Sequence, residues 1–569
     1  MLRSEIVAIG LALMAVQTRI AQSGSTSVVA DLRVHCNDID FPQNGTMVVS
    51  VLRSNANPTP VCSDNATYPD DDGLSCSSLE PVSDEGGFPS ASVKIMVLCR
   101  NEGAKEAWPS SRESSSPTKL EDLLSLGWYH LFLAVFMVPE LALESANMSL
   151  MVFVGAPGQL DCSQSNHSSS FTAGQCELLA NGNCTVKTGG HGFRSIADEW
   201  QLVCGGESAV ALITSLQMAG VLAGALVFGQ LADLYGRKWV AFTACLLLTL
   251  VGAASAFCAN WPTFAVMRAL SGLFLGGLMT SSYVFFIEFI PCNHRLWLKT
   301  LLGWSPLLAA FSLTAYLVGE WRLLTLVVNL GPGLVTLALF CFTEESPRWL
   351  IQTGRGEDGK RVLNRIANGW NRLDVAEDVI ASVVHCEIGS SGGDSPLRRS
   401  FWHLFSSVKL AVYSCILAFI WFTTSLTTYG LLFNLGNLSG SIYLNMVYYG
   451  MLRWGFNITA TTVDFFVAWF GRKAMHIGAT VVVAVSMGLT AWASMEASPG
   501  SDSLLLHLVR PLNLVAAGTT SILWIVAYLL AAELYPTPVR SLANAFCSMF
   551  ARIGAVLAPQ LLLLVHRIP

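Results

Sequence analysis

Long apolar segments that are nearly free of charged residues recur along most of the chain. A helix of about 20 apolar residues spans the roughly 30 Å hydrocarbon core of a bilayer, and isolated segments of this length satisfy their backbone in lipid only as helices. The pattern predicts an all-α polytopic membrane protein with eleven spans, six before a polar gap of about sixty residues and five after it. The predicted spans cover about 127–153, 208–232, 239–260, 262–290, 297–318, 321–343, 407–430, 441–466, 474–494, 504–532 and 541–566.

The composition supports this class. Charged residues make up 13% of the 569 residues, about half of the roughly 25% usual in soluble domains, and the mean hydropathy is +0.51. A soluble fold and a disordered chain are excluded on these grounds. A nucleic-acid-binding protein is excluded as well, since 33 Lys and Arg residues face 39 Asp and Glu residues.

The basic residues predict the orientation. If the spans alternate, the Lys- and Arg-rich loops all lie on one side, which the positive-inside rule makes cytosolic. The opposite loop, about 155–206, then lies in an oxidising extracellular compartment, where disulfides and glycosylation are expected. Four cysteines allow three pairings, and the sequence does not choose among them. The candidate disulfide and glycosylation residues of this loop are Cys162, Cys176, Cys184, Cys204, Asn166 and Asn183.

Three signals recur in the same order in both halves of the chain. Their offsets are nearly equal: 471 − 236 = 235, 510 − 268 = 242 and 533 − 288 = 245. They predict two parallel repeats of six helices each. The second repeat ends at Pro569 without room for a twelfth helix, and we expect a truncated or mis-spliced chain rather than an evolved eleven-span protein. The recurring signals are Gly236-Arg237-Lys238 with Gly471-Arg472-Lys473, Arg268 with Arg510, and Glu288-x-x-Pro291-x-x-x-Arg295 with Glu533-x-x-Pro536-x-x-x-Arg540.

Residues from about 119 onward carry motifs that resemble solute carrier family 22, the organic cation, organic anion and carnitine transporters of the major facilitator superfamily. The resemblance implies the major facilitator fold and a carrier of small organic ions that needs no cofactor or metal. The matching segments are Pro139-Glu140, Asn147-Met148-Ser149, EWQLVC at 199–204, GQLADLYGRK at 229–238, Trp321-Arg322, ESPRWL at 345–350, Tyr429-Gly430-Leu431 and ELYPTPVR at 533–540.

The resemblance also implies a gating machinery. The loop from Asp233 through Gly236 to Lys238 would latch the two halves in the outward-open state; simple anchoring explains the basic pair but not Asp233. The second copy has Ala468 at the corresponding place, so the latch is expected on one side only. The acid and base of the third signal would form charge relays, with solvated loop ends as the alternative. The predicted gating residues are Asp233, Gly236, Arg237, Lys238, Arg268, Glu288, Arg295, Glu533 and Arg540.

Arg552, deep in the last span, is the main candidate for substrate selection. Cation carriers of the resembling family have Asp there, whereas anion and carnitine carriers have Arg. A guanidinium in a low-dielectric cavity attracts carboxylate or sulfate strongly and repels ammonium. The alternative is an arginine paired internally with a carboxylate. Arg453 adds to the positive charge, and Asp464, about three helical turns away, is too far to neutralise it. Two arginines without a matching acid favour an organic anion or a zwitterion such as carnitine over a cation.

Aromatic residues of the same spans are expected to supply the cavity wall, since flat rings bind bulky apolar ions with little orientational demand. Helix packing or an interfacial belt is the alternative for each of them. The predicted aromatic residues are Trp304, Tyr316, Trp421, Tyr429, Tyr448, Tyr449, Trp454 and Trp524.

The first 118 residues do not fit the family topology. They combine a signal-like start at 1–22 with cysteines and sequons, which suits the outside, whereas the topology places them in the cytosol. We favour a fused or mispredicted leading exon over a small extracellular module with an extra crossing. The remaining domains are a six-helix half at 119–343, a cytosolic linker at 344–406 and a truncated half at 407–569.

We therefore expect a multi-pass plasma-membrane carrier that works by alternating access. Its expected partners are a small organic ion, membrane lipid and, for uphill work, a co- or counter-transported ion; no nucleic acid is expected. A non-transporting, receptor-like relative is the alternative. An enzyme is not expected, because no phosphate-binding loop and no metalloprotease or hydrolase motif occurs in the sequence.

Overall fold

The computed structural model describes residues 120–567, apart from 125, 157–158, 163–183, 188–191, 203–205, 292–293, 392–403, 467–471, 497–503 and 536. The segment 1–118, Asn166, Asn183, Cys176 and Cys204 lie outside the described residues. So do the side chains of Glu533 and Arg540, although their backbone belongs to described helices.

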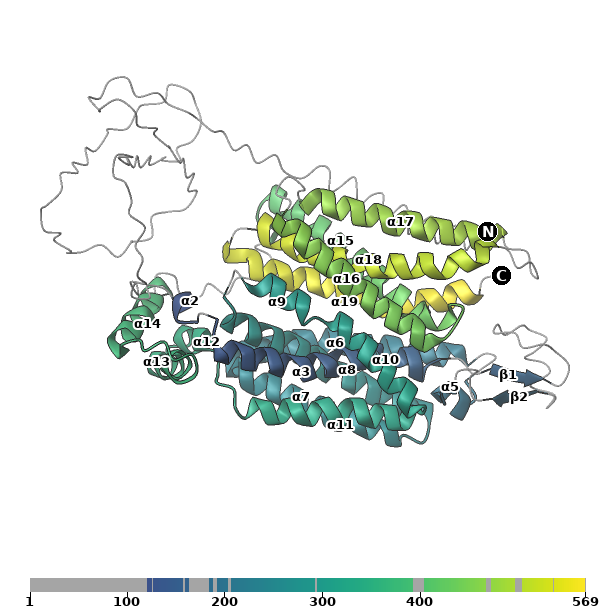
Figure 1. The fold of residues 1–569 in the computed structure, drawn as a ribbon, viewed down its shortest axis with the longest axis horizontal. Helices are drawn as coiled ribbons and strands as arrows, with labels where there is room; N and C mark the ends of the chain where they lie inside the picture. Colours follow the sequence, from purple (N-terminus) through teal and green to yellow (C-terminus); the bar gives the residue numbers. More distant parts are fainter. Residues whose placement is uncertain are drawn as a thin grey trace, which may run out of the picture. The chain divides into compact units, whose positions relative to one another are not determined.

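Helices form in all eleven predicted windows, and they assemble as two bundles (Figure 1). The first bundle contains α3 (Trp128–Val154), α6 (Glu207–Tyr235), α7 (Arg237–Ala254), α8 (Trp261–Phe289), α10 (Trp304–Val318) and α11 (Trp321–Phe340). The second contains α15 (Val408–Phe433), α16 (Ile442–Phe466), α17 (Arg472–Glu496), α18 (Leu504–Leu534) and α19 (Thr537–Arg567). The predicted helical membrane fold is therefore present.

Short elements join these helices. They are α2 (Leu120–Leu123), α5 (Ile196–Glu199), η1 (Ser255–Phe257), α9 (Arg295–Leu301) and η5 (Asn434–Asn437). Between the bundles the chain forms α12 (Pro347–Gln352), α13 (Gly356–Asn364), η3 (Arg365–Trp370) and α14 (Glu377–Ser391). Among the described residues, nine helices are long and apolar enough to cross a membrane. The count of eleven spans stays a prediction.

The fifth predicted span, 297–318, is not one helix. Helix α9 ends at Leu301 and α10 begins at Trp304. Proline lacks a backbone N–H, and its ring clashes with the carbonyl four residues earlier. For Pro306 that carbonyl belongs to Leu302, so a continuous helix through this point is disfavoured. Hydropathy alone does not reveal the break.

A small antiparallel ribbon is the other departure from the helical prediction. Strands β1 (Gln159–Cys162) and β2 (Cys184–Lys187) pair so that Cys162 lies opposite Cys184. The ribbon and the helices α12 to α14 mark opposite ends of the bundles (Figure 1). We call these the ribbon end and the linker end.

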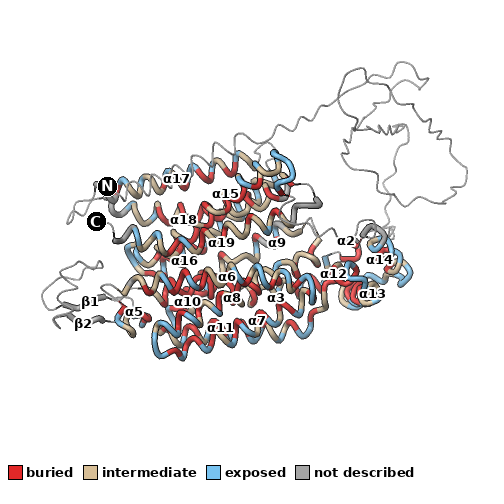
Figure 2. The backbone as a smooth tube through the Cα atoms, turned by 180° about the vertical axis from the view of Figure 1, so that it is seen from behind, coloured by how far each residue is buried: buried red, intermediate tan, exposed pale blue. Residues whose placement is uncertain are grey.

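In the core of the first bundle, the backbones of α6 and α8 lie unusually close together. A β-carbon at Gly220 or Gly224 of α6 would overlap a carbonyl oxygen of α8, and one at Gly272 or Gly276 of α8 would overlap a carbonyl oxygen of α6. Small residues permit such approach between helices in a membrane. Buried residues run along α3, α6 and α8 (Figure 2).

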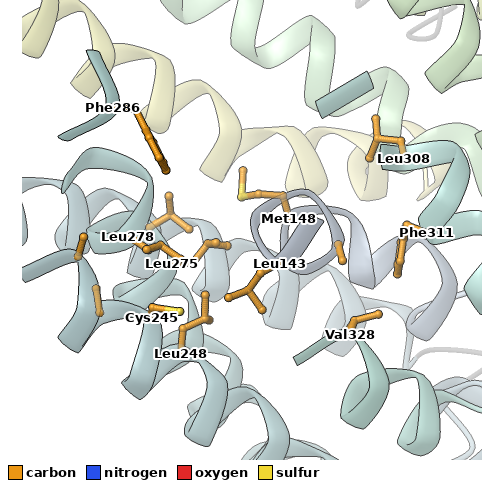
Figure 3. Packing of buried hydrophobic residues seen from close by; sticks show 14 of the residues in the cluster. Leu143, Met148, Cys245, Leu248, Leu275, Leu278, Phe286, Leu308, Phe311 and Val328 are labelled. Carbon is orange, nitrogen blue, oxygen red and sulfur yellow. The ribbon is translucent and has the colours of Figure 1, made fainter. Parts of the chain in front are cut away.

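Apolar side chains from several helices close the space around these backbones. Figure 3 shows residues of the buried cluster from α3, α7 and α8 converging from three sides. The labelled members there include Leu143 and Met148 of α3, Cys245 and Leu248 of α7, and Leu275 and Leu278 of α8.

Candidate functional site

Hydrogen bonds join the two bundles toward both ends of their interface. Ser215 of α6 donates to the carbonyl of Val556 in α19 (2.9 Å) and accepts from Gln560 (3.1 Å). Ser312 of α10 donates to the carbonyl of Tyr443 at the start of α16 (2.8 Å). Toward the linker end, the hydroxyls of Thr300 in α9 and Thr461 in α16 lie 3.0 Å apart. The central part of the interface lies between these contacts.

Arg552 projects from α19 into this central part. Its Nη2 lies 3.9 Å from Sδ of Met279 in α8 of the other bundle. Its positive charge lies within electrostatic range of Glu144 in α3 and of Tyr429 in α15. Within the described ranges, no carboxylate forms an ion pair with Arg552 at 4.0 Å or less. The predicted guanidinium thus lies at the junction of the halves.

Three further predicted residues converge on the same region. The hydroxyl of Tyr429 lies within electrostatic range of Arg453 and Tyr449 as well as Arg552. Arg453 donates from Nη1 to the Tyr449 hydroxyl (3.0 Å) and to Oγ1 of Thr520 (3.2 Å). Its guanidinium carbon lies 5.2 Å from the centre of the Tyr449 ring. The structure therefore brings both predicted arginines to one tyrosine.

Two buried carboxyl groups were missed as site residues. Glu140 and Glu144 lie one turn apart on α3 and are 1% and 4% exposed. Oγ of Ser282 donates to Oε1 of Glu144 (3.4 Å), and the Trp304 side chain hydrogen-bonds to the same carboxyl group. Two acids four residues apart within an apolar span were the signal, since ionisable residues in lipid mark function by default.

The expectation of two arginines without a matching acid did not include Glu144, which lies near Arg552 but forms no ion pair with it in the described ranges. Glu144 comes from a helix more than 400 residues away from Arg552 in the chain. Sequence spacing considers only neighbours along a helix, whereas the acid reaches the site across the bundle interface. Trp304, predicted as a wall residue, is a partner of that acid.

The other predicted aromatics divide into two groups. Trp421 is buried and packs edge-on against Tyr528 and Trp524, with ring centres 4.5 and 5.7 Å away. Its Nε1, Oγ1 of Thr424 and Oγ of Ser425 are buried and have no hydrogen-bond partner among the described residues, and the same holds for Nε1 of Trp454. Buried polar atoms of this kind call for water or a ligand.

Tyr316 and Tyr448 do not join this group. They are 64% and 47% exposed, and Tyr316 packs edge-on against Tyr443 at the ribbon end. Tyr448 lies beside Arg510 instead. Their place on the outer face of the helices explains why residue type alone did not separate them from the wall.

The predicted gating loop binds within its own half. Gly236 has φ +107°, and Arg237 binds Asp233 and Glu288, the latter at 3.3 Å. The backbone N–H of Lys238 donates to Oε1 of Glu345 (3.0 Å). Burial raises the pKa of Glu345. The hydrogen bonds that its carboxylate accepts from backbone N–H groups act in the opposite direction. In the described part of the chain, the ion pairs of this loop all lie in the first half.

Glu288 and Arg295, the predicted relay pair, bind different partners in this structure. Glu288 binds Arg237, while Nε of Arg295 donates to the carbonyl of Ile290 (2.9 Å). Helix α8 ends at Phe289 and α9 begins at Arg295, so the Arg295 side chain binds the backbone at the end of α8 instead of Glu288. The corresponding pair Glu533 and Arg540 lies outside the described side chains.

Arg268, predicted to gate, is wholly buried inside the first bundle. It donates from Nε and Nη2 to Oε1 of Gln217 (3.2 and 3.0 Å) and from Nη2 to the carbonyl of Asn147 (3.2 Å). It thereby ties α8 to α6 and α3. A buried cation needs such partners to be tolerated.

Glu199, just before the second predicted span, forms a further charged contact near the ribbon end. It accepts from Nε1 of Trp321 (2.9 Å) and pairs with Arg322. The hydrogen bond from Arg322 lowers the pKa of Glu199. In the described ranges, no group of three or more side chains could hold a metal ion.

Comparison with known protein families gives one match, the sugar (and other) transporters, over residues 151–567. Solute carrier family 22 member 15 of Xenopus tropicalis is 30% identical over 451 residues, which cover 76% of this chain and 80% of the relative. Organic cation/carnitine transporter 4 of Arabidopsis thaliana is 30% identical over 446 residues, with coverage of 75% and 79%.

Solved structures show the same fold. The inward open conformation of the xylose transporter XylE from E. coli matches with a TM-score of 0.52 and 17% identity, covering 77% of this chain and 90% of that one. The proton:xylose symporter XylE bound to 6-bromo-6-deoxy-D-glucose matches with a TM-score of 0.51 and 18% identity, covering 76% and 88%. The predicted major facilitator fold is confirmed.

Proposed function

The chain belongs to solute carrier family 22, within the sugar (and other) transporters, and from this premise we propose that it carries small organic anions or zwitterions. The carrier is placed in the plasma membrane, with the linker helices in the cytosol. The abundance of Lys and Arg on the linker side supports this orientation.

The single observation that carries the substrate class is the position of Arg552. It lies at the interface of the bundles, and no carboxylate of the described part of the chain pairs with it directly. Substrate sites of carriers built from two repeats lie at the repeat interface near the bilayer midplane. A guanidinium there binds carboxylate, sulfonate or phosphate through charge-assisted hydrogen bonds.

The balance of charge around the site favours an anion or a zwitterion over a cation. Arg552 and Arg453 bring two positive charges near Tyr429. Glu140 and Glu144 are buried one turn apart, where two negative charges would repel each other, so we expect one of them to hold a proton and the pair to carry one negative charge. One uncompensated positive charge remains, and the nearby rings of Trp421, Trp524 and Tyr528 suit an aromatic substrate body.

Alternating access is supported by the pattern of contacts between the bundles. Serine hydroxyls and the packed rings of Tyr316 and Tyr443 join them toward the ribbon end. At the linker end Thr300 meets Thr461, while the charged loop binds its own half. This arrangement suits a state that is closed on the ribbon side. A substrate that binds two such states unequally can shift their populations.

Tracer flux tests the proposal. The full chain is reconstituted in proteoliposomes and offered naphthalene-2-sulfonate, carnitine and tetraethylammonium, each radiolabelled. We expect saturable uptake of the sulfonate or carnitine but not of the ammonium ion. Saturable uptake of the ammonium ion alone contradicts the anion assignment, and the absence of saturable flux for all three favours a non-transporting relative.

An exchange of charge sharpens the test. Arg552→Asp should lower sulfonate uptake at least tenfold, since a hydrogen bond to a charged group contributes about 1.5–3 kcal/mol. Arg361→Asp serves as the control, because Arg361 lies on the exposed face of α13 and its side chain is 74% exposed. Equal uptake by both variants would remove Arg552 from the site.

A further inference from the structure

The carboxyl pair on α3 is arranged to hold a proton. Glu140 and Glu144 lie one turn apart on α3, and both are buried inside the bundle. A buried carboxylate without a paired cation is costly, and two of them one turn apart repel each other, so the pair is suited to keep one proton. Neither residue is accessible enough for water to stabilise two negative charges, since both are at least nineteen-twentieths buried.

The groups that face the pair leave it without a direct counter-charge. Ser282 of α8 and Trp304 of α10 provide hydrogen bonds to Glu144, and the thiol of Cys245 in α7 lies within electrostatic range. Oε1 of Glu140 is buried and has no hydrogen-bond partner among the described residues.

Two arginines of the surrounding helices have different roles. Arg268, which contacts Asn147 one turn along α3, is saturated by its own amide partners. Arg552 of α19 is the positive charge that acts on Glu144, and it comes from the other bundle. The proton and Arg552 therefore compete to neutralise the same carboxyl pair.

We propose that the Glu140–Glu144 pair binds one proton that travels with the substrate, and that this proton releases Arg552 for the anion. The proposal rests on the proposed anion-binding role of Arg552. With the proton bound, the pair carries one negative charge against two arginines, and the site accepts one monoanion. Without it, the pair carries two negative charges, which hold Arg552 and repel the anion.

The cycle balances charge. One proton binds to the carboxyl pair from the side to which the site is open, and one monoanion binds to Arg552. Both leave on the opposite side, the proton returning to water and the anion to solution. Each cycle thus moves one proton and one monoanion together, so the transport is electroneutral and a pH gradient drives it.

The test uses naphthalene-2-sulfonate, because an aryl sulfonate stays ionised over the whole working range and any effect of pH then belongs to the protein. Uptake into proteoliposomes with a clamped membrane potential is measured between about pH 5.5 and 7.5. We expect uptake to rise as the external pH falls, approaching tenfold per pH unit where proton binding limits it. A trapped pH dye should report that the lumen acidifies during uptake.

Glu144→Gln imitates the protonated acid. Uptake by this variant should persist, lose its dependence on pH and no longer acidify the lumen; Glu140→Gln should act likewise if Glu144→Gln fails to fold. Asp378→Asn, at an exposed acid of α14, serves as the matched control and should keep the wild-type pH profile.

The outcomes separate the two proposals. Saturable sulfonate uptake by the wild-type chain that ignores pH and moves no protons overturns the coupling and leaves the anion carrier standing. A wild-type pH profile in folded Glu144→Gln and Glu140→Gln also overturns it. Absence of sulfonate and carnitine uptake at every pH rejects the proposed function itself.

Discussion

Arg268 and Arg510 occupy matching places in the two bundles, and each donates its Nε–H to a side-chain amide oxygen on the second helix of its own bundle. The acceptor of Arg268 is Gln217 of α6 (3.2 Å), and that of Arg510 is Asn445 of α16 (2.8 Å). The sequence offset between the two arginines is one of the three that predict a duplication. The equivalent hydrogen bond in each bundle gives structural support to the predicted duplication.

Loss of the Arg268 side chain should destabilise the first bundle. Arg268→Met would leave the buried Oε1 of Gln217 without a donor, at a cost of about 1–3 kcal/mol. The carbonyl of Asn147 would keep only its hydrogen bond from the Gln217 side-chain amide. We expect a clearly lower melting temperature of the detergent-solubilised protein. Arg361→Met, on an exposed face, should leave the melting temperature unchanged. A stable Arg268→Met protein would show that this network is dispensable.

The contact between α6 and α8 should not accept a methyl group. At Gly224 a β-carbon would overlap the carbonyl oxygen of Leu273, whereas at Gly331 of α11 nothing lies within 4 Å. Gly224→Ala should therefore reduce the yield of folded protein and the melting temperature. Gly331→Ala should be neutral or slightly stabilising, since Ala is favoured over Gly in a helix by up to about 1 kcal/mol. Size-exclusion profiles and melting curves compare the two, and equal behaviour would contradict the close approach.

Gly236 has both a positive φ and a close neighbouring side chain, whereas Gly354 has a positive φ without a close neighbour. Gly236 (φ +107°) faces Oε2 of Glu345, while Gly354 (φ +79°) has open space around it. Alanine at Gly354 should cost only the backbone strain of a left-handed residue, about 1–2 kcal/mol. Alanine at Gly236 should cost more and slow tracer uptake, because it also displaces Glu345 from the N–H of Lys238. Similar uptake by both variants would mean that the position of Glu345 does not matter.

Acid should weaken the contact between Glu199 and Arg322. The hydrogen bond from Arg322 lowers the pKa of Glu199 in the folded protein. A carboxyl group whose pKa is depressed stabilises the fold above its unfolded pKa of about 4.3, and this contribution disappears as the pH falls through the folded value. The melting temperature should thus fall more steeply below about pH 4.5 in the wild type than in Glu199→Gln. Glu320→Gln, at an exposed acid, should follow the wild type; parallel curves for wild type and Glu199→Gln would reject the assignment.

Hydropathy was sufficient to locate the helices, because each window of apolar residues forms a helix whose partners hardly affect its existence. It could not locate the break at Gly303, which depends on the stereochemistry of Pro306. The family motifs led to Arg552, Arg453, Tyr429 and Tyr449, which the fold brings together.

The partners of the charged side chains were harder to predict than the positions of the helices. The partner of Glu288 is Arg237, from another helix, and the acid near Arg552 is Glu144, from the other bundle. Both are long-range contacts that a single sequence does not encode by spacing. The sequence signal for the second contact was the occurrence of two acidic residues within one apolar span.

The interlocked glycines of α6 and α8 have a mechanical consequence. Backbones that touch at four glycines cannot slide past one another without steric overlap, so we expect these two helices to move together as one rigid body. Displacement must then be absorbed where α6 meets α19 and α10 meets α16, through hydrogen bonds from serine hydroxyls to backbone carbonyls and through the packed rings of Tyr316 and Tyr443. Such contacts can re-form after a small rotation, so we expect the two bundles to pivot against each other at this interface.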